Sequence, residues 1–302
     1  MGDDPERLYR LDGVAHIAGV INDEPQQCIA SMRRQQGMRL DDRYVLYLQM
    51  AGLYHLARLN DRWFRLDEPL VSAFVERWRP ETHIFHMPFG ECTITLPRVA
   101  WCRGVHGSDP IRISAETFGE CPEGADEETV RRYARAYIMM LLGTQLFADK
   151  SGNRVHSRWL PYMARIEEMG GYSWGSAALT WLYRCMCRVA NRHVVKLAGP
   201  LQLLQSWILW HFLGFRPAGY DTFSWPLASR WAGHNPSASE KGPRLQMWRL
   251  RIDLLQTGDF IWMPYSSPDV LQVVHPEVLE PRHTVLWRCV TALIYFAVIE
   301  WH

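Results

Sequence analysis

Most hydrophobic residues of this chain recur at the three- and four-residue spacing of an α-helix. The longest such stripe has apolar positions at Val130, Tyr133, Ala134, Tyr137, Ile138, Leu141 and Leu142. Asp126 stands where a helix cap belongs, and Glu127 and Glu128 follow it at the positive end of the helix dipole. The pattern predicts a helix that begins after Asp126 and runs to about Leu142.

Other segments repeat this spacing with clear start and stop signals. Asp67 can cap a helix that holds Pro69 in its first turn, and Pro80 ends that helix. Pro200 stands just inside the start of another helix. Helices are predicted at about residues 44–60, 67–79, 176–195, 200–212 and 283–301, with a further apolar segment at 245–255 and a short strand at 260–263.

The clearest strand signal lies between residues 82 and 96. Residues 82–87 and 92–96 are rich in β-branched and aromatic side chains, and Pro88, Phe89 and Gly90 separate the two runs. Strand, turn and strand in this order predict a hairpin. The expected fold class is therefore mainly α, a single irregular helical domain with one small β-hairpin.

The remaining segments organise the chain around this domain. Residues 1–43 are polar and show little periodicity, so we expect a loosely ordered N-terminal lead-in followed by one domain at 44–302. Residues 101–117 follow neither period and predict a loop, and residues 214–244 are rich in Gly, Pro and Ser and predict a long irregular connection.

Composition places the chain among ordinary globular proteins. It has 302 residues, 48% of them hydrophobic, and a net charge of +1, so no overall attraction to nucleic acid or membrane is expected. Seven scattered cysteines without a signal peptide predict free thiols in a reducing compartment. The longest uncharged apolar run, 289–299, is too short to span a bilayer. We therefore expect a soluble intracellular protein.

The basic residues are almost all arginine. Lysine occurs only at Lys150, Lys196 and Lys241, while 14 tryptophans far exceed common usage. Arginine stems lying over tryptophan faces would account for both features. A coding sequence biased toward G and C would also favour arginine.

Pairs of metal-ligand type are present but poorly placed for metal binding. His83 and His86 are three residues apart, so on a strand they point to opposite faces. Cys185 and Cys187 on a helix point about 200° apart. Neither pair is followed by a second pair with zinc-ligand spacing. We expect structural or surface histidines, core thiols and no metal site.

Motifs of catalytic chemistry are missing as well. The sequence contains no Gly-x-x-x-x-Gly-Lys-Ser/Thr or Gly-x-Gly-x-x-Gly phosphate-binding loop, and no Gly-x-Ser-x-Gly motif of a serine nucleophile. Pyridoxal phosphate needs a Schiff-base lysine, but Lys150 and Lys241 lie in turn-like stretches and Lys196 lies at a predicted helix end. We therefore predict no catalytic residues, no cofactor and no enzymatic activity.

One group of arginines forms a candidate binding face. Arg184, Arg188 and Arg192 are spaced four residues apart and share one side of a predicted helix. A solvated face is the default interpretation, and binding of phosphate or of an acidic partner is the alternative. A second group, Arg131, Arg132 and Arg135, lies on the polar side of the best helix.

Several long segments between about residue 44 and the end of the chain have a recognisable sequence. They are 51–56, 63–67, the block 74–96 that contains Arg77-Trp78-Arg79-Pro80 and His86-Met87-Pro88-Phe89-Gly90, then 141–147, 175–179, 199–207 and Arg230-Trp231. Together these segments resemble the plant mobile domain family, which also carries the label aminotransferase-like.

The resemblance implies a nuclear, transposon-related plant protein. Such proteins are linked to transposon silencing, gene expression and meristem maintenance, and some act with a phosphatase-seven-like protein partner. The resemblance brings no catalytic residue with it. We therefore expect a non-catalytic binding or assembly module. A nucleic-acid-binding module that uses the arginine face is the alternative, and a metal-independent enzyme comes third.

The chain departs from the family pattern at two places. After Thr95 and Leu96, the usual continuation is replaced by a short unrelated stretch up to about Glu116. The chain also stops at His302, where members of the family continue. We therefore expect a plant mobile domain that is internally deleted near 97–116 and truncated at its C-terminus.

Overall fold

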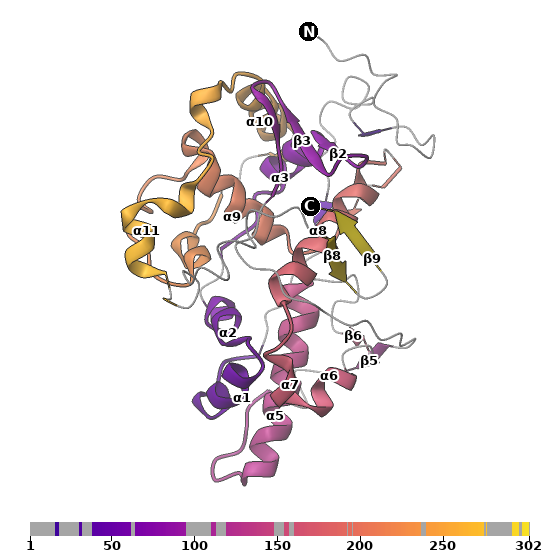
Figure 1. Cartoon of the computed structure of the whole chain (residues 1–302), viewed down its shortest axis with the longest axis vertical. Coiled ribbons are helices and arrows are strands. Elements are labelled where there is room, and N and C mark those ends of the chain that lie inside the picture. The colour runs from indigo at the N-terminus through magenta and orange to yellow at the C-terminus, as the bar shows by residue number, and fades with distance from the viewer. Residues whose placement is uncertain are drawn as a thin grey trace.

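The computed structural model describes most of the chain between residues 38 and 274. The described ranges are 38–61, 64–94, 119–147, 160–191, 193–194, 196–236 and 240–274, with short pieces at 16–17, 30–31, 110–112, 154–156, 276, 292–295 and 298–301. The fold is mainly α and forms a single domain, as the sequence predicts. Figure 1 shows it elongated along the vertical axis, with two groups of helices stacked one above the other.

The lower group, here called the helical half, has its own buried core. Its helices are α1 (Val45–Met50), α2 (Tyr54–Asp61), α5 (Glu127–Met140), α6 (Leu160–Ala164) and α7 (Ile166–Met169). Leu141–Leu146 continues α5 as a π-helix. Methionines at 38, 139, 140, 163 and 169 fill much of this core, and an unbranched side chain suits the irregular gaps between short helices.

The upper group, here called the aromatic half, surrounds a small antiparallel sheet. The sheet has the order β2 (Trp78–Arg79), β3 (Ile84–Met87) and β4 (Gly90–Cys92). The helices around it are α3 (Glu68–Val75), α9 (Leu201–His211), α10 (Lys241–Asp253) and α11 (Pro268–Val273). Its core includes the buried tryptophans 78, 207, 210, 231 and 248.

Helix α8 (Trp174–Val189) belongs to both halves. Trp174, Ala177 and Ala178 at its start lie in the core of the helical half, and Leu179 and the buried residues after it lie in the core of the aromatic half. Trp181 contacts both cores, and its indole Nε1 donates a hydrogen bond to the Phe147 carbonyl (2.7 Å). The two halves are thus joined through one continuous helix.

Start signals and the hairpin are confirmed, but the helix predicted to run up to Pro80 ends at Val75, and Trp78 and Arg79 form β2 instead. The Asp126 carboxylate accepts from Thr129 N (3.0 Å) at the start of α5, and Asp67 accepts from Leu70 N (3.2 Å) at the start of α3. In the hairpin, Phe85 pairs with Cys92 across β3 and β4. The helices predicted at 176–195 and 200–212 are present as α8 and α9, and the segment 245–255 lies in α10 and the residues just after it.

The single helix predicted at 44–60 is wrong, because two helices occupy this stretch. Gly52 between α1 and α2 has φ +69°, a left-handed conformation that breaks the helix and that glycine adopts at little cost. The apolar stripe continues across the break because both helices bury residues in the same core, among them Leu48, Leu53 and Ala57.

The closing helix predicted at 283–301 is also wrong over its described part. Ala292–Tyr295 (β8) and Val298–Trp301 (β9) form an antiparallel hairpin that packs against α8. A short apolar run has no period that separates helix from strand, and the β-branched and aromatic residues here favour the strand. Residues 277–291 lie outside the described residues.

The short strand predicted at 260–263 is reduced to one bridge between Phe260 and Phe212. Pro264 follows at once, lacks an N–H to extend a ladder and begins a short 3-10 helix, Pro264–Ser266. Two other small pairings complete the described strands: Ala30–Ser31 (β1) with Lys196–Leu197 (β7), and Pro110–Arg112 (β5) with Arg154–His156 (β6).

Described pieces of the N-terminal 43 residues contact the domain. β1 pairs with β7, and His16 Nε2 donates to the Trp78 carbonyl (2.8 Å). Met38 is buried in the core of the helical half.

Candidate functional site

The predicted arginine face lies on α8. Arg184 and Arg188 are exposed and one helical turn apart, and no carboxylate of the described residues forms an ion pair with either. Arg192 lies outside the described residues. Two of the three predicted residues are therefore brought to one solvent-facing side. Of the second group, Arg131 pairs with Glu167 on α7 (2.5 Å).

A second set of arginines lies at the C-terminal end of α9. We call it the arginine–aromatic cluster, and it consists of Trp210, Arg216, Phe223, Arg230, Trp231 and Tyr265. The Arg230 guanidinium carbon lies 4.7 Å from the centre of the Trp210 ring, 4.8 Å from that of Phe223 and 5.1 Å from that of Trp231. The Arg216 guanidinium carbon lies 5.6 Å from the same Trp210 ring.

Backbone carbonyls hold both guanidiniums in place. Arg216 donates from Nε to the Leu209 carbonyl (2.8 Å) and from Nη2 to the Trp210 carbonyl (2.7 Å), which satisfies two free carbonyls at the end of α9. Arg230 donates from Nε to the Tyr220 carbonyl (2.6 Å). Burial lowers the pKa of both arginines, and the positive charge of Arg230 lowers the pKa of Arg216 further.

His211, the next residue on α9, is buried in its neutral form. Its ring stacks on Phe260 (5.0 Å between centroids), and Nδ1 donates to the Ile261 carbonyl (2.7 Å). Burial lowers the pKa of His211 to about 4. Its Nε2 and the indole Nε1 atoms of Trp207 and Trp210 are buried without a hydrogen-bond partner among the described residues.

Ion pairs join α3 to α10 across the aromatic half. Arg249 makes a two-point contact with Glu76, from Nη2 to Oε1 (2.7 Å) and from Nε to Oε2 (2.8 Å). Arg244 Nη2 donates to Asp67 Oδ2 (2.6 Å), so Asp67 caps α3 and binds α10 at once. Burial raises the pKa of Glu76, and Arg249 opposes that change. Asp67 and Glu76 therefore hold α3 against α10.

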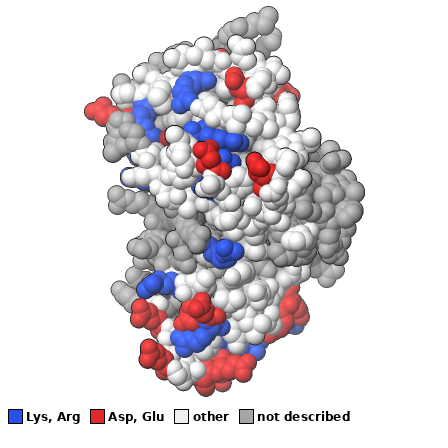
Figure 2. Space-filling view, turned by 90° about the vertical axis from the view of Figure 1, so that its left-hand side faces the viewer, with Lys and Arg blue, Asp and Glu red and all other residues white. Residues whose placement is uncertain are grey.

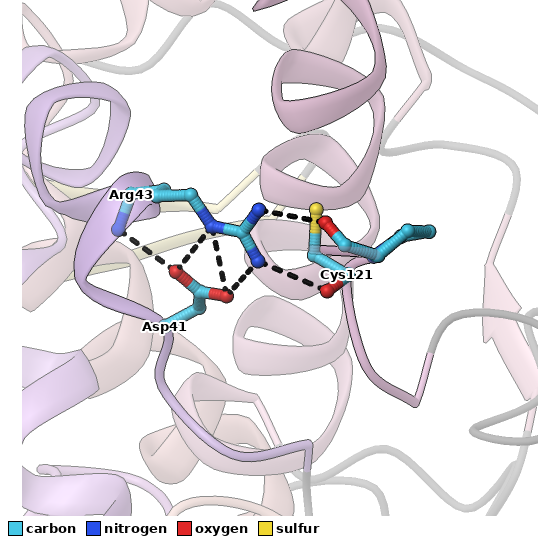
Figure 3. A network of polar contacts seen from close by, with 4 residues as sticks. Asp41, Arg43 and Cys121 are labelled. Carbon is cyan, nitrogen blue, oxygen red and sulfur yellow. Dashed lines mark hydrogen bonds and ion pairs between the residues drawn. The ribbon is translucent and has the colours of Figure 1, made fainter. Parts of the chain in front are cut away.

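Arg43 organises the start of the helical half (Figure 3). Its guanidinium donates to the Asp41 carboxylate (Nη2 to Oδ2, 2.6 Å) and to two backbone carbonyls ahead of α5, those of Cys121 (2.9 Å) and Pro122 (2.8 Å). Hydrogen bonding to Arg43 lowers the pKa of Asp41. The network ties residues 41–43 to the loop before α5.

The two pairs of metal-ligand type are held apart. His83 lies in the turn before β3, with φ 55°, and stacks on Trp78 (5.9 Å), while His86 is exposed on β3. Cys185 is buried, and Cys187 accepts from Trp78 Nε1 (3.3 Å). Within the described residues, no three His, Cys, Asp or Glu side chains gather in a way that could hold a metal ion.

Helix α10 is apolar on two opposite faces. Leu245, Trp248 and Ile252 are buried in the aromatic half. On the other side, the outer stripe of α10 consists of Met247, Leu250 and Leu254, which are 42%, 59% and 67% exposed. Because successive helix residues turn by about 100°, these two sets lie on opposite sides of the helix.

Sequence reasoning missed the arginine–aromatic cluster and the outer stripe. The cluster falls largely within residues 214–244, for which the sequence predicts an irregular connection. A signal is present, because Arg216 and Arg230 lie among aromatic residues at 210, 212, 215, 220, 223, 225 and 231. The stripe had the helical spacing 247, 250 and 254, opposite the apolar positions expected to be buried.

Charge on the surface is mixed. Figure 2 views the molecule from the side on which α11 lies in Figure 1, and there Lys and Arg side chains lie among Asp and Glu side chains with uncharged surface between them. In the described part of the chain, no helix has both the length and the apolar character needed to cross a membrane.

Comparison with known proteins gives consistent matches over the chain. The family model described as plant mobile domain matches residues 52–118 and 123–302. Protein MAIN-LIKE 1 of Arabidopsis thaliana is 29% identical over 99% of this chain. From the same plant, Protein MAINTENANCE OF MERISTEMS is 32% identical over 98% of the chain, and a serine/threonine-protein phosphatase 7 long form homolog is 32% identical over 94%.

These relatives are longer than this chain. The matches cover 64% of MAIN-LIKE 1, 67% of MAINTENANCE OF MERISTEMS and 25% of the phosphatase 7 long form homolog. No solved structure matches the chain.

Proposed function

Because the chain belongs to the plant mobile domain family, a group of transposon-related plant proteins, we propose that it is a non-catalytic nuclear protein that acts by assembling with a protein partner. Through this assembly it serves transposon silencing, gene expression and meristem maintenance. The proposed partner is a phosphatase-seven-like protein that carries the same kind of domain, as the phosphatase 7 long form homolog does over the matched part.

The outer stripe of α10 carries this proposal. A helix that is apolar on two opposite faces is normally covered on both, and here one of them faces solvent. Exposed leucines and methionine in one row are typical of the protein contacts that amphipathic helices make. Such a contact would bury the stripe without using any charged group of the domain.

The proposal of a non-catalytic role rests on how the described titratable groups are used. Asp67, Glu76 and Asp41 are each held by an arginine in a structural contact, and Cys92 is a buried thiol whose pKa burial raises to about 12. A thiol with so high a pKa is a poor nucleophile near neutral pH.

The test uses the purified full chain and the purified phosphatase 7 long form homolog of Arabidopsis thaliana. Isothermal titration calorimetry should detect a complex, and Leu250→Glu with Leu254→Glu should weaken it by about tenfold or more, because two buried contacts are replaced by charges. The control is Leu46→Glu, since Leu46 on α1 is similarly exposed at 62% but lies in the helical half.

Binding that survives the paired α10 change, or that Leu46→Glu weakens equally, would reject the outer stripe as the contact. A separate measurement addresses location: a fluorescent fusion expressed in plant cells should accumulate in the nucleus. Exclusion of the fusion from the nucleus would contradict the proposed role in silencing.

A nucleic-acid-binding module is the second candidate, and Arg184 and Arg188 favour it, because both are exposed and neither forms an ion pair with a described residue. In that case DNA affinity should fall steeply with salt, and Arg184→Gln with Arg188→Gln should reduce the slope of that dependence by roughly one to two phosphate contacts. Affinity that does not depend on salt would dismiss this candidate.

A further inference from the structure

The arginine–aromatic cluster differs from the other buried arginine contacts in the aromatic half. Arg244 and Arg249 each meet a carboxylate at hydrogen-bonding distance. Arg216 and Arg230 meet aromatic rings and carbonyls instead, and within the described part of the chain neither forms an ion pair. Among the described residues, two half-buried cations therefore lie together without an anion at hydrogen-bonding distance.

Hydrogen-bond donors exceed acceptors in the cluster. After its two carbonyl contacts, Arg216 keeps Nη1 free, and Arg230 keeps both Nη atoms free, because only its Nε has a partner among the described residues. The indole Nε1 of Trp210 is buried without an acceptor. A site that offers more donors than acceptors suits a ligand made of acceptor atoms.

The two guanidiniums lie beside the same ring and act on each other. Their carbons lie 5.6 and 4.7 Å from the centre of the Trp210 ring, so they are separated by no more than about 10 Å, and the positive charge of Arg230 lowers the pKa of Arg216. The hydroxyl of Tyr265 adds a further group, since its ring packs on Trp210 (5.6 Å between centroids) and it has no hydrogen-bond partner in the described part. Asp221 is the one acid close enough to act on the pKa of both arginines, and it is exposed.

Both guanidiniums are fixed before any ligand arrives. Arg230 is packed among three rings, and Arg216 is anchored to the end of α9. Arginines held in this way lose little side-chain entropy on binding, and the two free Nη atoms of Arg230 form a planar fork that matches two oxygens of a phosphate group. A phosphate dianion would also balance the two positive charges.

We propose that the arginine–aromatic cluster is a binding site for a phosphate group, held by the free Nη atoms of Arg216 and Arg230 beside the Trp210 ring. The ligand is phosphate itself or a phosphate monoester. This site is separate from the outer stripe of α10, so it stands or falls independently of the proposed protein contact.

The test follows indole signals by NMR while inorganic phosphate is added to the full chain at constant ionic strength. The Nε1–H signals of Trp210 and Trp231, assigned through Trp→Phe variants, should shift in a saturable manner with phosphate and not with chloride. The Trp174 signal serves as an internal reference, because that indole is bonded to the Ala51 carbonyl in the helical half.

Variants then locate the anion. Arg230→Gln should weaken phosphate binding by about tenfold or more, because it removes a charge-assisted contact. Arg216→Lys keeps the charge but loses the two carbonyl contacts that position it, and a smaller loss is expected. The matched control is Arg165→Gln, which removes one positive charge from the surface of the helical half, where this side chain is 72% exposed, and should leave the titration unchanged.

The source of the phosphate group is decided by a parallel titration with O-phosphoserine and with adenosine monophosphate. Tighter binding of a monoester than of inorganic phosphate assigns the site to a modified side chain or a nucleotide, and equal binding assigns it to the free ion. Trp210 and Trp231 signals that do not move at millimolar phosphate in the unmodified chain would overturn the proposal. An equal response in the folded Arg165→Gln and Arg230→Gln variants would do the same.

Discussion

The cores of the two halves of this domain are filled by different kinds of side chain. The aromatic half contains five of the buried tryptophans, at 78, 207, 210, 231 and 248, and the helical half contains one, Trp174. The aromatic half also buries charge, through the pairs that link α3 to α10. In the helical half, methionines and alanines fill the space, and its ion pairs lie nearer the surface.

This difference indicates where function can be added. Large rings pack well but leave polar atoms without partners, and three indole or imidazole nitrogens on α9 are buried in that state. Each such group carries a cost that water, a ligand or a partner can relieve. In the helical half, the indole of Trp174 donates to the Ala51 carbonyl, and the described buried atoms without a partner are Arg131 Nε, Arg135 Nε and Gln145 Oε1 rather than ring nitrogens. Both proposed binding regions accordingly lie in the aromatic half.

The largest expected effect tests whether buried charge supports the aromatic half. The Glu76 side chain is 2% exposed and Arg249 12%, so removing one partner leaves the other charge buried and unpaired. Arg249→Leu should destabilise the protein by about 4 kcal/mol. Urea unfolding followed by circular dichroism measures this change.

The matched control is the double variant Glu76→Leu with Arg249→Leu. Removing both charges should recover most of the lost stability, because an apolar pair of similar volume can replace a buried ion pair. If Arg249→Leu unfolds no more easily than the unmodified chain, the pair is not a structural support and the contrast between the halves weakens.

The next effect tests close packing in the helical half. A Cβ atom at Gly170 would lie 2.6 Å from the Met50 carbonyl oxygen, so the turn after α7 cannot accept a side chain without moving α1. Gly170→Ala should cost about 3 kcal/mol by overpacking. Gly171→Ala is the control and should change stability little, because a Cβ atom there would lie 3.4 Å from the Glu168 carbonyl oxygen. Equal thermal stability of the two variants would contradict this account.

A smaller effect concerns pH and sets the aromatic half apart. The pKa of His211 is lowered to about 4 in the folded chain, so in the range between about 4 and 6.5 the unfolded chain binds a proton that the folded chain does not. Stability from this group is therefore present above about pH 6.5 and is lost as pH falls toward 4. Between pH 7 and pH 5 the loss should be about 2 kcal/mol.

The variant His211→Asn separates this effect from other titrations. An asparagine amide can replace the Nδ1 donor to the Ile261 carbonyl and has no charge to gain. Its stability should fall less between pH 7 and pH 5 than that of the unmodified chain. The same pH dependence in both proteins would show that His211 is not the responsible group.

Local signals were sufficient for most elements of the fold. Asp67 and Asp126 cap the helices that their neighbours predict, and the Pro88–Gly90 turn joins the strands on either side. These features depend on residues three or four apart. The helix predicted at 283–301 is wrong over its described part because a short apolar run has no spacing that separates helix from strand. The described strands there depend on contact with α8.

The candidate site depended on contacts that sequence does not encode locally. Arg184 and Arg188 could be placed on one face by their spacing alone. Arg216 and Arg230 are brought to Trp210 only when residues 214–231 fold back over the end of α9. No periodic pattern in that Gly- and Pro-rich stretch predicts the return, so the cluster became visible only in three dimensions.

The smallest effect tests how the two halves are joined. Trp181 contacts both cores, and its Nε1–H donates to the Phe147 carbonyl at the end of the π-helix (2.7 Å). Trp181→Phe keeps an aromatic ring at this position but removes the donor, which should cost about 1 kcal/mol.

Because α8 continues through both cores, we expect the halves still to unfold in one transition. Hydrogen exchange should report the same opening free energy for the amides of α5 and α9 in the unmodified chain and in the variant. Different opening free energies in the unmodified chain would mean that the two cores unfold separately, and that α8 connects them without coupling their stability.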